Sequence, residues 1–224
     1  MSGLLYSSWP LAYWLNPTAN RGLASNLGGI GQPYNWVFII LDIISGLGVC
    51  AVAVWLYGSA HPRAHSLTKL AVINYGLFGL FTALDAILPV DCAADQNQCG
   101  ALINHPLVIW HGLISLTSIA CLTFSLMCIW WLVIRLGKKP SWLRYMLKTT
   151  LVVWLFFGFL TGILLFLNRS SALSQHVFII ACSLWTGLMP YVIRHEGITS
   201  LDRLNKTIKI RRRLARVVKS QFGA

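Results

Sequence analysis

The sequence is poor in charged residues. They make up 11% of its 224 residues, whereas globular chains carry about a quarter. Acidic residues are the scarcest, since 6 Asp and Glu stand against 18 Lys and Arg. Hydrophobic residues make up 56% of the chain, and the mean hydropathy is +0.66. This composition excludes an ordinary soluble domain.

Several signatures of chemistry and targeting are also missing. The chain has no C-x-x-C pair of the kind that binds zinc, no phosphate-binding glycine loop and no internal repeat. The N-terminus does not resemble a secretory signal, because it lacks a basic start and Pro10 interrupts its apolar run. No cofactor is therefore firmly implied. We expect no nucleic-acid partner, because the basic residues collect in two loops and the C-terminal tail.

Long apolar runs are what the sequence does contain. Several of them reach the roughly 20 residues that a helix needs to cross a bilayer. We predict an all-α polytopic membrane protein with a bundle of five transmembrane helices, at 36–57, 68–88, 106–134, 149–167 and 172–193. The chain then divides into an extracytoplasmic, interfacial N-terminal segment (1–35), the bundle (36–193) and a basic cytoplasmic tail (194–224). Residues 4–15 are too short to span, and both an interfacial and a re-entrant segment fit them.

The loops predict the orientation. Segments 61–69 and 135–148 and the tail are basic, whereas 91–95 is acidic. Five spans place the basic segments on one side, so the positive-inside rule predicts an outside N-terminus and a cytoplasmic C-terminus in the plasma or inner membrane. Cys92 and Cys99 would then lie outside, where an oxidising compartment favours a disulfide between them.

The tail also has a helical pattern. Apolar residues recur near helical spacing from 201 to 222 among many basic residues. A basic amphipathic helix on the anionic cytoplasmic leaflet explains this pattern, and so does a solvated basic end that only satisfies topology. The residues predicted to lie on the membrane surface are Arg211, Arg212, Arg213, Arg216 and Lys219.

Four ionisable residues from four predicted helices share one depth. At about 1.5 Å per helical residue, they lie roughly 6–9 Å inside the outer boundary. They are Asp42, Asp85, His111 and His176. Ser45 lies one turn below Asp42, and Ser115 lies one turn below His111 on the same helical face. Ionisable residues inside a membrane usually have a partner or a function, so these six residues are the candidate site.

Three interpretations of this group stay open. The charges can simply pair, Asp85 with His111 or Asp42 with His176, and tie helices together. The group can form a polar pocket for a headgroup, an ion or a small amphiphile. The two His and two Asp can also bind a divalent metal such as zinc that activates water, with Ser115 polarising a carbonyl. Nucleophilic catalysis by Ser115 through His111 is not expected, because no third group orients the pair.

Short motifs resemble one known family. They are LASNLGG at 23–29, Asp85-x-x-Leu-Pro-x-Asp-Cys, His111-x-x-x-Ser115, and ALSQHVFIIACSLWTGLM at 172–189. On these motifs the chain resembles the bacterial and archaeal integral membrane proteins of domain of unknown function 998. The resemblance implies a membrane location and a six-helix fold whose first helix is missing or reduced here. A partner or a lipid could fill the groove that this helix leaves.

The preferred function is a non-enzymatic one. We expect a small lipid- or partner-binding bundle, or a subunit of a larger membrane assembly. Its expected partners are membrane lipids, another membrane protein or a second copy of the chain. The alternative is a metal-dependent transmembrane hydrolase acting on a lipid in the outer leaflet. It has a looser analogy in ceramidase-like enzymes, which use three histidines around zinc, whereas this chain offers two. A transporter subunit ranks last, because the inner half of the spans holds few polar groups.

Overall fold

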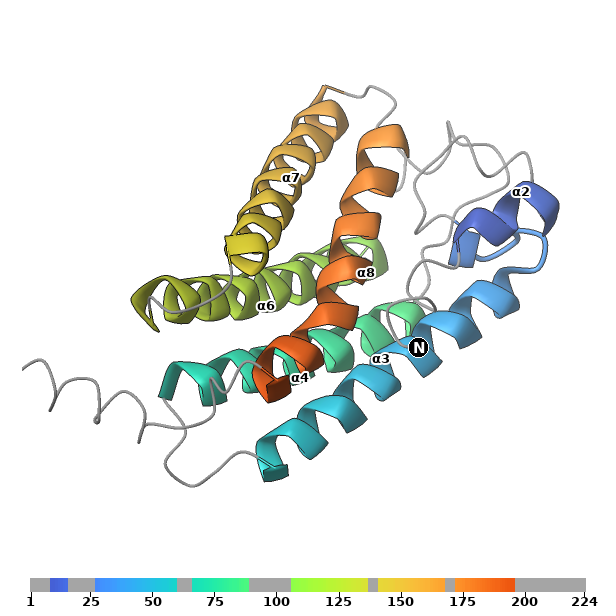
Figure 1. The fold of residues 1–224 in the computed structure, drawn as a ribbon. Coiled ribbons are helices and arrows are strands. Elements are labelled where there is room, and N and C mark those ends of the chain that lie inside the picture. The colour runs from blue at the N-terminus through green and yellow to red at the C-terminus, as the bar shows by residue number, and fades with distance from the viewer. Residues whose placement is uncertain are drawn as a thin grey trace, which may run out of the picture.

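The computed structural model describes residues 9–15, 27–59, 66–88, 106–136, 141–167 and 172–195. This part of the chain is helical and contains no strand. Its elements are η1 (Trp9–Leu11), α2 (Ala12–Leu15), α3 (Asn35–Ser59), α4 (Ser66–Ile87), α6 (Pro106–Leu136), α7 (Ser141–Phe166) and α8 (Ala172–His195) (Figure 1). Five of these helices are long and apolar enough to cross a membrane. The predicted fold class is confirmed, and the protein is a multi-pass membrane protein.

One predicted boundary is wrong. The sequence predicts a basic loop over 135–148, but α7 already begins at Ser141. Its first turns contain Leu, Arg, Met and Lys, which are good helix formers, so the helix extends past the apolar core of the span. The other four helices agree closely with their predicted spans.

The N-terminal segment packs against the beginning of α3. Leu15 at the end of α2 contacts a small core formed by Leu27 and Phe38. A turn at Gly31 (φ 84°) and Tyr34 (φ 58°) leads into α3. Glycine adopts positive φ without strain, so this turn suits Gly31. The segment is thereby attached to the same end of α3 that carries Asp42.

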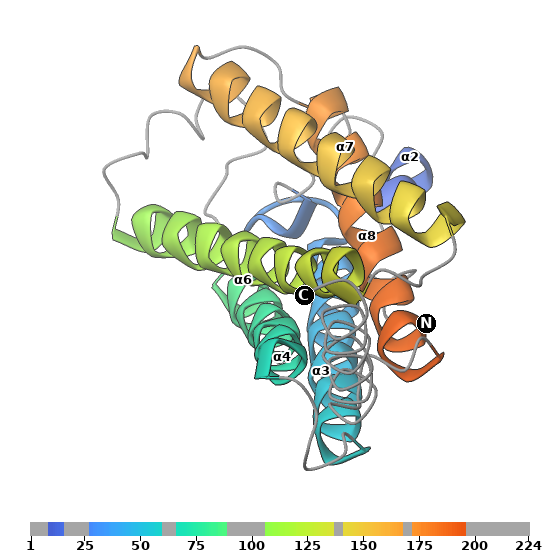
Figure 2. The same cartoon turned by 60° about the vertical axis from the view of Figure 1, so that its left-hand side comes forward.

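Helices α3, α4 and α6 form one packed layer. In both ribbon views α3 and α4 lie side by side (Figures 1 and 2). Helix α6 packs against α4 and runs along it in the view of Figure 1. The crossing of α3 and α4 is very close, because Gly46 faces Gly79. A β-carbon on Gly46 would lie 2.5 Å from the Gly79 carbonyl oxygen and 2.8 Å from the Ala83 nitrogen. Small residues that let backbones approach are typical of membrane helix pairs.

Helices α7 and α8 form a second unit. The rings of Trp154 and Phe178 meet edge to face, with centroids 5.1 Å apart. Gly158 leaves room for the Phe178 ring, which lies 3.1 Å from the position of an added β-carbon. Near the end of α7, Thr161 donates a hydrogen bond to Ser174 at 2.9 Å. Both views show this pair crossing the α3–α4–α6 layer obliquely (Figures 1 and 2).

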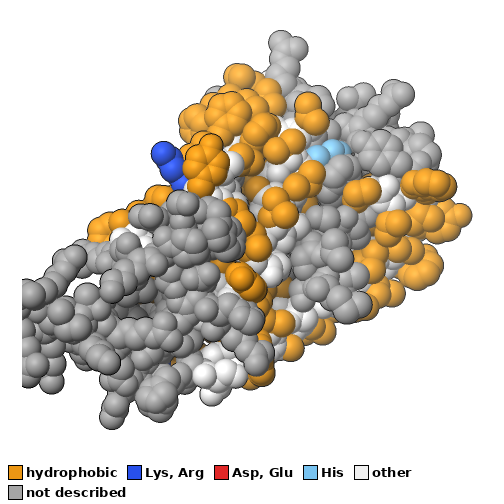
Figure 3. Space-filling model, viewed as in Figure 1, with side chains coloured by type: hydrophobic (Ala, Val, Ile, Leu, Met, Phe, Trp, Pro, Cys, Tyr) orange, Lys and Arg blue, Asp and Glu red, His pale blue; other side chains and the backbone are white. Residues whose placement is uncertain are grey.

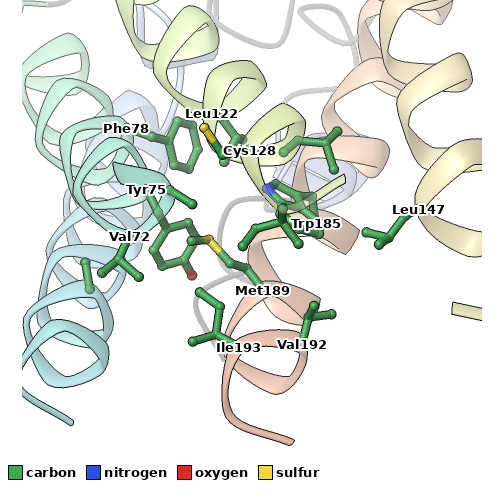
Figure 4. Close-up of a cluster of buried hydrophobic side chains, with 14 of the residues drawn as sticks. Val72, Tyr75, Phe78, Leu122, Cys128, Leu147, Trp185, Met189, Val192 and Ile193 are labelled. Carbon is green, nitrogen blue, oxygen red and sulfur yellow. The ribbon is translucent and has the colours of Figure 1, made fainter. Parts of the chain in front are cut away.

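The two units meet in a buried core. Tyr75 and Phe78 extend from α4 towards Met189 and Trp185 of α8 (Figure 4). The Tyr75 hydroxyl donates a buried hydrogen bond of 2.8 Å to the carbonyl oxygen of Thr186. Pro190 lies inside α8, four residues after Thr186. Because proline has no N–H, it cannot satisfy that carbonyl within the helix. Tyr75 therefore supplies the hydrogen bond that Pro190 cannot.

The outer surface of the described helices is largely apolar. On the face that Figure 3 displays, hydrophobic side chains cover most of the described surface. The exposed side chains include Trp14, Val54, Phe159 and Leu173. An apolar exterior around a packed helical core is what a lipid environment requires. Cys92, Cys99 and the tail residues from Arg211 to Lys219 lie outside the described residues.

Candidate functional site

A line of polar side chains, which we call the polar row, connects α4 and α6. The hydroxyl groups of Thr82 and Ser118 form its inner end. Ser118 of α6 donates a hydrogen bond to the carbonyl oxygen of Phe78 at 3.4 Å. Its oxygen also lies 3.1 Å from the Thr82 hydroxyl. Both hydroxyl residues are buried. Since Ser118 has one hydrogen and gives it to Phe78, Thr82 is the donor in the second contact. The Thr82 and Ser118 hydroxyl groups are therefore both hydrogen-bonded across this interface.

The same row continues to Asp85. Ser115 donates to Asp85 Oδ1 at 2.7 Å, and His111 Nδ1 lies 3.2 Å from the same oxygen. His111 Nδ1 is also 3.0 Å from the carbonyl oxygen of Leu88, just beyond the end of α4. His111 and Ser115 reach one partner because residues four apart lie on one helical face. Two residues of α6 thus hold one carboxylate of α4.

These contacts determine the tautomer of His111. The Leu88 carbonyl can only accept a hydrogen bond, so Nδ1 carries the hydrogen. In a neutral imidazole, Nε2 then has a free lone pair. In this arrangement the Ser115 hydroxyl donates to Asp85, and the imidazole does not accept its hydrogen.

Asp42 joins this group from α3. It lies one turn before Gly46, so the close approach of Gly46 to Gly79 and Ala83 brings this turn of α3 towards the end of α4 that carries Asp85. Asp42 and Asp85 are close enough for their charges to interact. No described residue donates a hydrogen bond to Asp42. Together, Asp42, Asp85, His111 and Ser115 form what we call the Asp85 site.

The other two candidate residues lie elsewhere in the fold. Ser45 is buried on α3 beside the Gly46 crossing. His176 is buried near the beginning of α8, and the most extensive helix contact of α8 is with α7. The described polar contacts near it join Thr161 and Ser174. The Asp85 site thus brings together candidate residues from α3, α4 and α6, while His176 belongs to the second helical unit.

Comparison with known proteins identifies the family. The family model "Protein of unknown function (DUF998)" matches residues 2–189, which is most of the chain. The chain belongs to this family. The resemblance that the motifs indicated is therefore confirmed. No curated protein matches the chain, and no solved structure does.

The family match includes the N-terminal segment as well as the bundle. It starts at residue 2 and therefore covers η1, α2 and the turn before α3. It ends at Met189, so the whole predicted tail (194–224) lies beyond it. In this DUF998 chain the segment that packs on α3 is part of the family region, and the Asp85 site lies wholly within it.

The described part of this DUF998 chain contains no group of three or more His, Cys, Asp or Glu side chains that could hold a metal ion. The metal site proposed for Asp42, Asp85, His111 and His176 gains no support from this geometry and stays a prediction. The cysteines Cys50, Cys121, Cys128 and Cys182 are free thiols within the helices.

Three participants in the polar row were not predicted. Thr82 lies three residues before Asp85 and Ser118 lies seven residues after His111, so both share a helical face with a predicted residue. This spacing was the available signal. The third participant, the Leu88 carbonyl, has no signal in the side-chain pattern, because it becomes available only where α4 ends.

Proposed function

We propose that this protein is a non-enzymatic membrane bundle whose Asp85 site binds the polar headgroup of an amphiphile. It would act as a lipid-binding protein or as a subunit of a larger membrane assembly. One observation carries this proposal. Asp85 is held in place by Ser115 and His111, yet the Asp85 and His111 side chains keep 24% and 13% of their surface exposed.

The arrangement favours binding over simple pairing. The attraction within an ion pair is strongest in a low-dielectric interior, so a pair that only ties two helices together does not need an exposed carboxylate. Here Oδ1 of Asp85 makes both described contacts, the hydrogen bond from Ser115 and the 3.2 Å contact with His111 Nδ1, which leaves Oδ2 as an acceptor. Asp42 adds a second carboxyl group with no described donor. The site therefore has unused hydrogen-bonding capacity close to the end of two helices.

The position of the site supports an amphiphile as the ligand. Asp85 and Leu88 stand at the end of α4, and His111 stands near the beginning of α6. With the predicted topology, this end lies at the level where lipid headgroups meet the hydrocarbon. A molecule with a polar head and an apolar tail could then reach the site while its tail stays beside the apolar helix surface.

The metal-dependent hydrolase remains the second candidate, because one observation favours it. Histidines that ligate metals usually donate their other ring N–H to a carboxylate or carbonyl. His111 does this through Nδ1, so its Nε2 is oriented as a ligand atom would be. The candidate needs further ligands that converge on Nε2, and the described residues supply no such group.

Lipid retention tests the preferred function. The wild-type protein, Asp85→Asn and the control Asn74→Ala would be purified from the same membranes and analysed by native mass spectrometry. Asn74 lies on the same helix and bonds its own Leu70 carbonyl, so its loss leaves the site intact. We expect a bound amphiphile in the wild type and the control. Asp85→Asn should retain about tenfold less, since hydrogen bonds to charged groups contribute about 1.5–3 kcal/mol.

Two outcomes would overturn the proposal. One is a wild-type protein that carries no bound amphiphile under conditions that keep it folded. The other is equal retention by the wild type and Asp85→Asn, which would place the bound molecule elsewhere on the apolar surface. Melting temperatures of all three proteins would show that the variants are folded.

A further inference from the structure

Among the described residues, the Asp85 site contains more acidic than basic groups. It contains the carboxyl groups of Asp42 and Asp85, and the imidazole of His111 contacts that of Asp85. The Lys side chains that the structure describes lie far from it. Lys69 is sixteen residues before Asp85 on α4, about 24 Å along the helix. Lys148 lies near the beginning of α7, in the other helical unit.

A positive partner would stabilise the ionised form of two carboxyl groups at such a place. An ionised carboxylate inside a membrane is costly unless another charge compensates it. His111 can compensate one carboxylate and already points Nδ1 at Asp85. Asp42 interacts with Asp85 as a like charge. The arrangement is therefore complementary to a ligand that brings a second positive charge.

The hydrogen bonds specify the ligand further. Asp85 Oδ2 and both oxygens of Asp42 accept no hydrogen bond from the described residues. A ligand that fills the site therefore needs several N–H donors as well as a positive charge. A primary ammonium group has three donors. A quaternary ammonium group has none, and proteins usually recognise it with aromatic rings.

We propose that the amphiphile bound at the Asp85 site carries a primary ammonium group, which lies between Asp42 and Asp85. This inference rests on the proposed function and adds the chemistry of the ligand. Charge-assisted N–H···O bonds to both carboxylates hold the ammonium group. His111 and Ser115 act as positioning residues, because they hold Asp85 in the orientation that receives it.

A lipid competition experiment tests this chemistry. The protein would be reconstituted in nanodiscs with equal amounts of phosphatidylethanolamine, phosphatidylcholine and phosphatidylglycerol that share the same acyl chains. The first two have the same net charge and differ in their N–H donors, and the third lacks a cation. We expect the wild-type protein to retain phosphatidylethanolamine about tenfold over either competitor, as expected for charge-assisted hydrogen bonds.

Substitutions of Asp42 test whether its carboxylate determines the preference for phosphatidylethanolamine. Asp42→Asn should reduce the enrichment to near the bulk ratio, whereas Asp42→Glu should preserve it because the charge remains. Asp202→Asn removes a carboxylate from the tail, outside the described residues, and serves as the matched control with unchanged enrichment. If Asp42→Asn kept the full preference, Asp42 would have no part in binding and the proposed placement of the ammonium group would be wrong.

The outcomes separate this inference from the proposed function. Equal retention of phosphatidylethanolamine and phosphatidylcholine, or a preference for phosphatidylglycerol, would refute the ammonium ligand. An Asp85-dependent lipid would still bind in that case, and the proposed function would stand. No lipid retained from any of the three classes, in nanodiscs or from native membranes, would overturn both.

Discussion

Replacing Tyr75 with phenylalanine removes one hydroxyl group from the buried core between α4 and α8. That hydroxyl bonds the Thr186 carbonyl at 2.8 Å, and Tyr75 is 1% exposed. The carbonyl has no N–H available from Pro190. In Tyr75→Phe it would be left buried without this donor. The reverse reasoning applies to Pro190→Ala, which restores the N–H at position 190.

The two substitutions should therefore be coupled. A buried group left without its partner costs about 1–3 kcal/mol, whereas interhelical hydrogen bonds in membranes average about 0.6 kcal/mol with a maximum near 1.7. We expect Tyr75→Phe to lower the free energy of unfolding by about 1 kcal/mol in the wild type, because the proline removes the usual alternative. In the Pro190→Ala background we expect less than half of that loss.

Equilibrium unfolding of the wild type, both single variants and the double variant in mixed micelles would measure this coupling. The cycle cancels effects that each substitution has alone, such as a change in the bend of α8. An equal loss on Tyr75→Phe in both backgrounds would refute the reasoning, since it would mean that an N–H at position 190 does not replace the Tyr75 hydroxyl at the Thr186 carbonyl.

The remaining predictions concern the helix crossing, the polar row and metal binding. Gly46→Ala should lower the free energy of unfolding by about 1–3 kcal/mol, because its β-carbon would lie 2.5 Å from a backbone oxygen of α4. Gly162→Ala, which meets nothing within 4 Å, is the control and should leave thermal stability unchanged or slightly higher. Thr82→Val and Ser118→Ala should each destabilise, and the double variant should lose less than their sum; strict additivity in unfolding experiments would contradict their hydrogen bond. Elemental analysis of purified protein should find no stoichiometric zinc, whereas zinc that is lost on His111→Ala would favour the hydrolase.

Much of the fold could be predicted because membrane spans depend on length and hydropathy. The ranges of α3, α4, α6 and α8 follow from apolar runs bounded by polar or proline-containing segments. The beginning of α7 could not be predicted in this way, because a helix can continue through basic residues that hydropathy assigns to a loop.

The candidate site could be predicted in part. Equal depth grouped His111 with Asp85, and the four-residue spacing placed Ser115 on the same helical face as His111. In the structure both side chains contact Asp85 Oδ1, at 3.2 and 2.7 Å. Depth does not say which helices are neighbours, so it could not show that His176 belongs to the α7–α8 unit. Nor could it show the bond between Tyr75 and the Thr186 carbonyl, which depends on the packing of two helices distant in sequence.

An experimental structure of the protein in a lipid nanodisc would test the central claim most directly. We predict that Asp85 accepts hydrogen bonds from Ser115 and His111, and that the headgroup of an amphiphile lies within about 3 Å of a carboxylate of the Asp85 site. A structure in which Asp85 and His111 face away from each other, with only hydrocarbon chains beside this end of α4 and α6, would contradict the account.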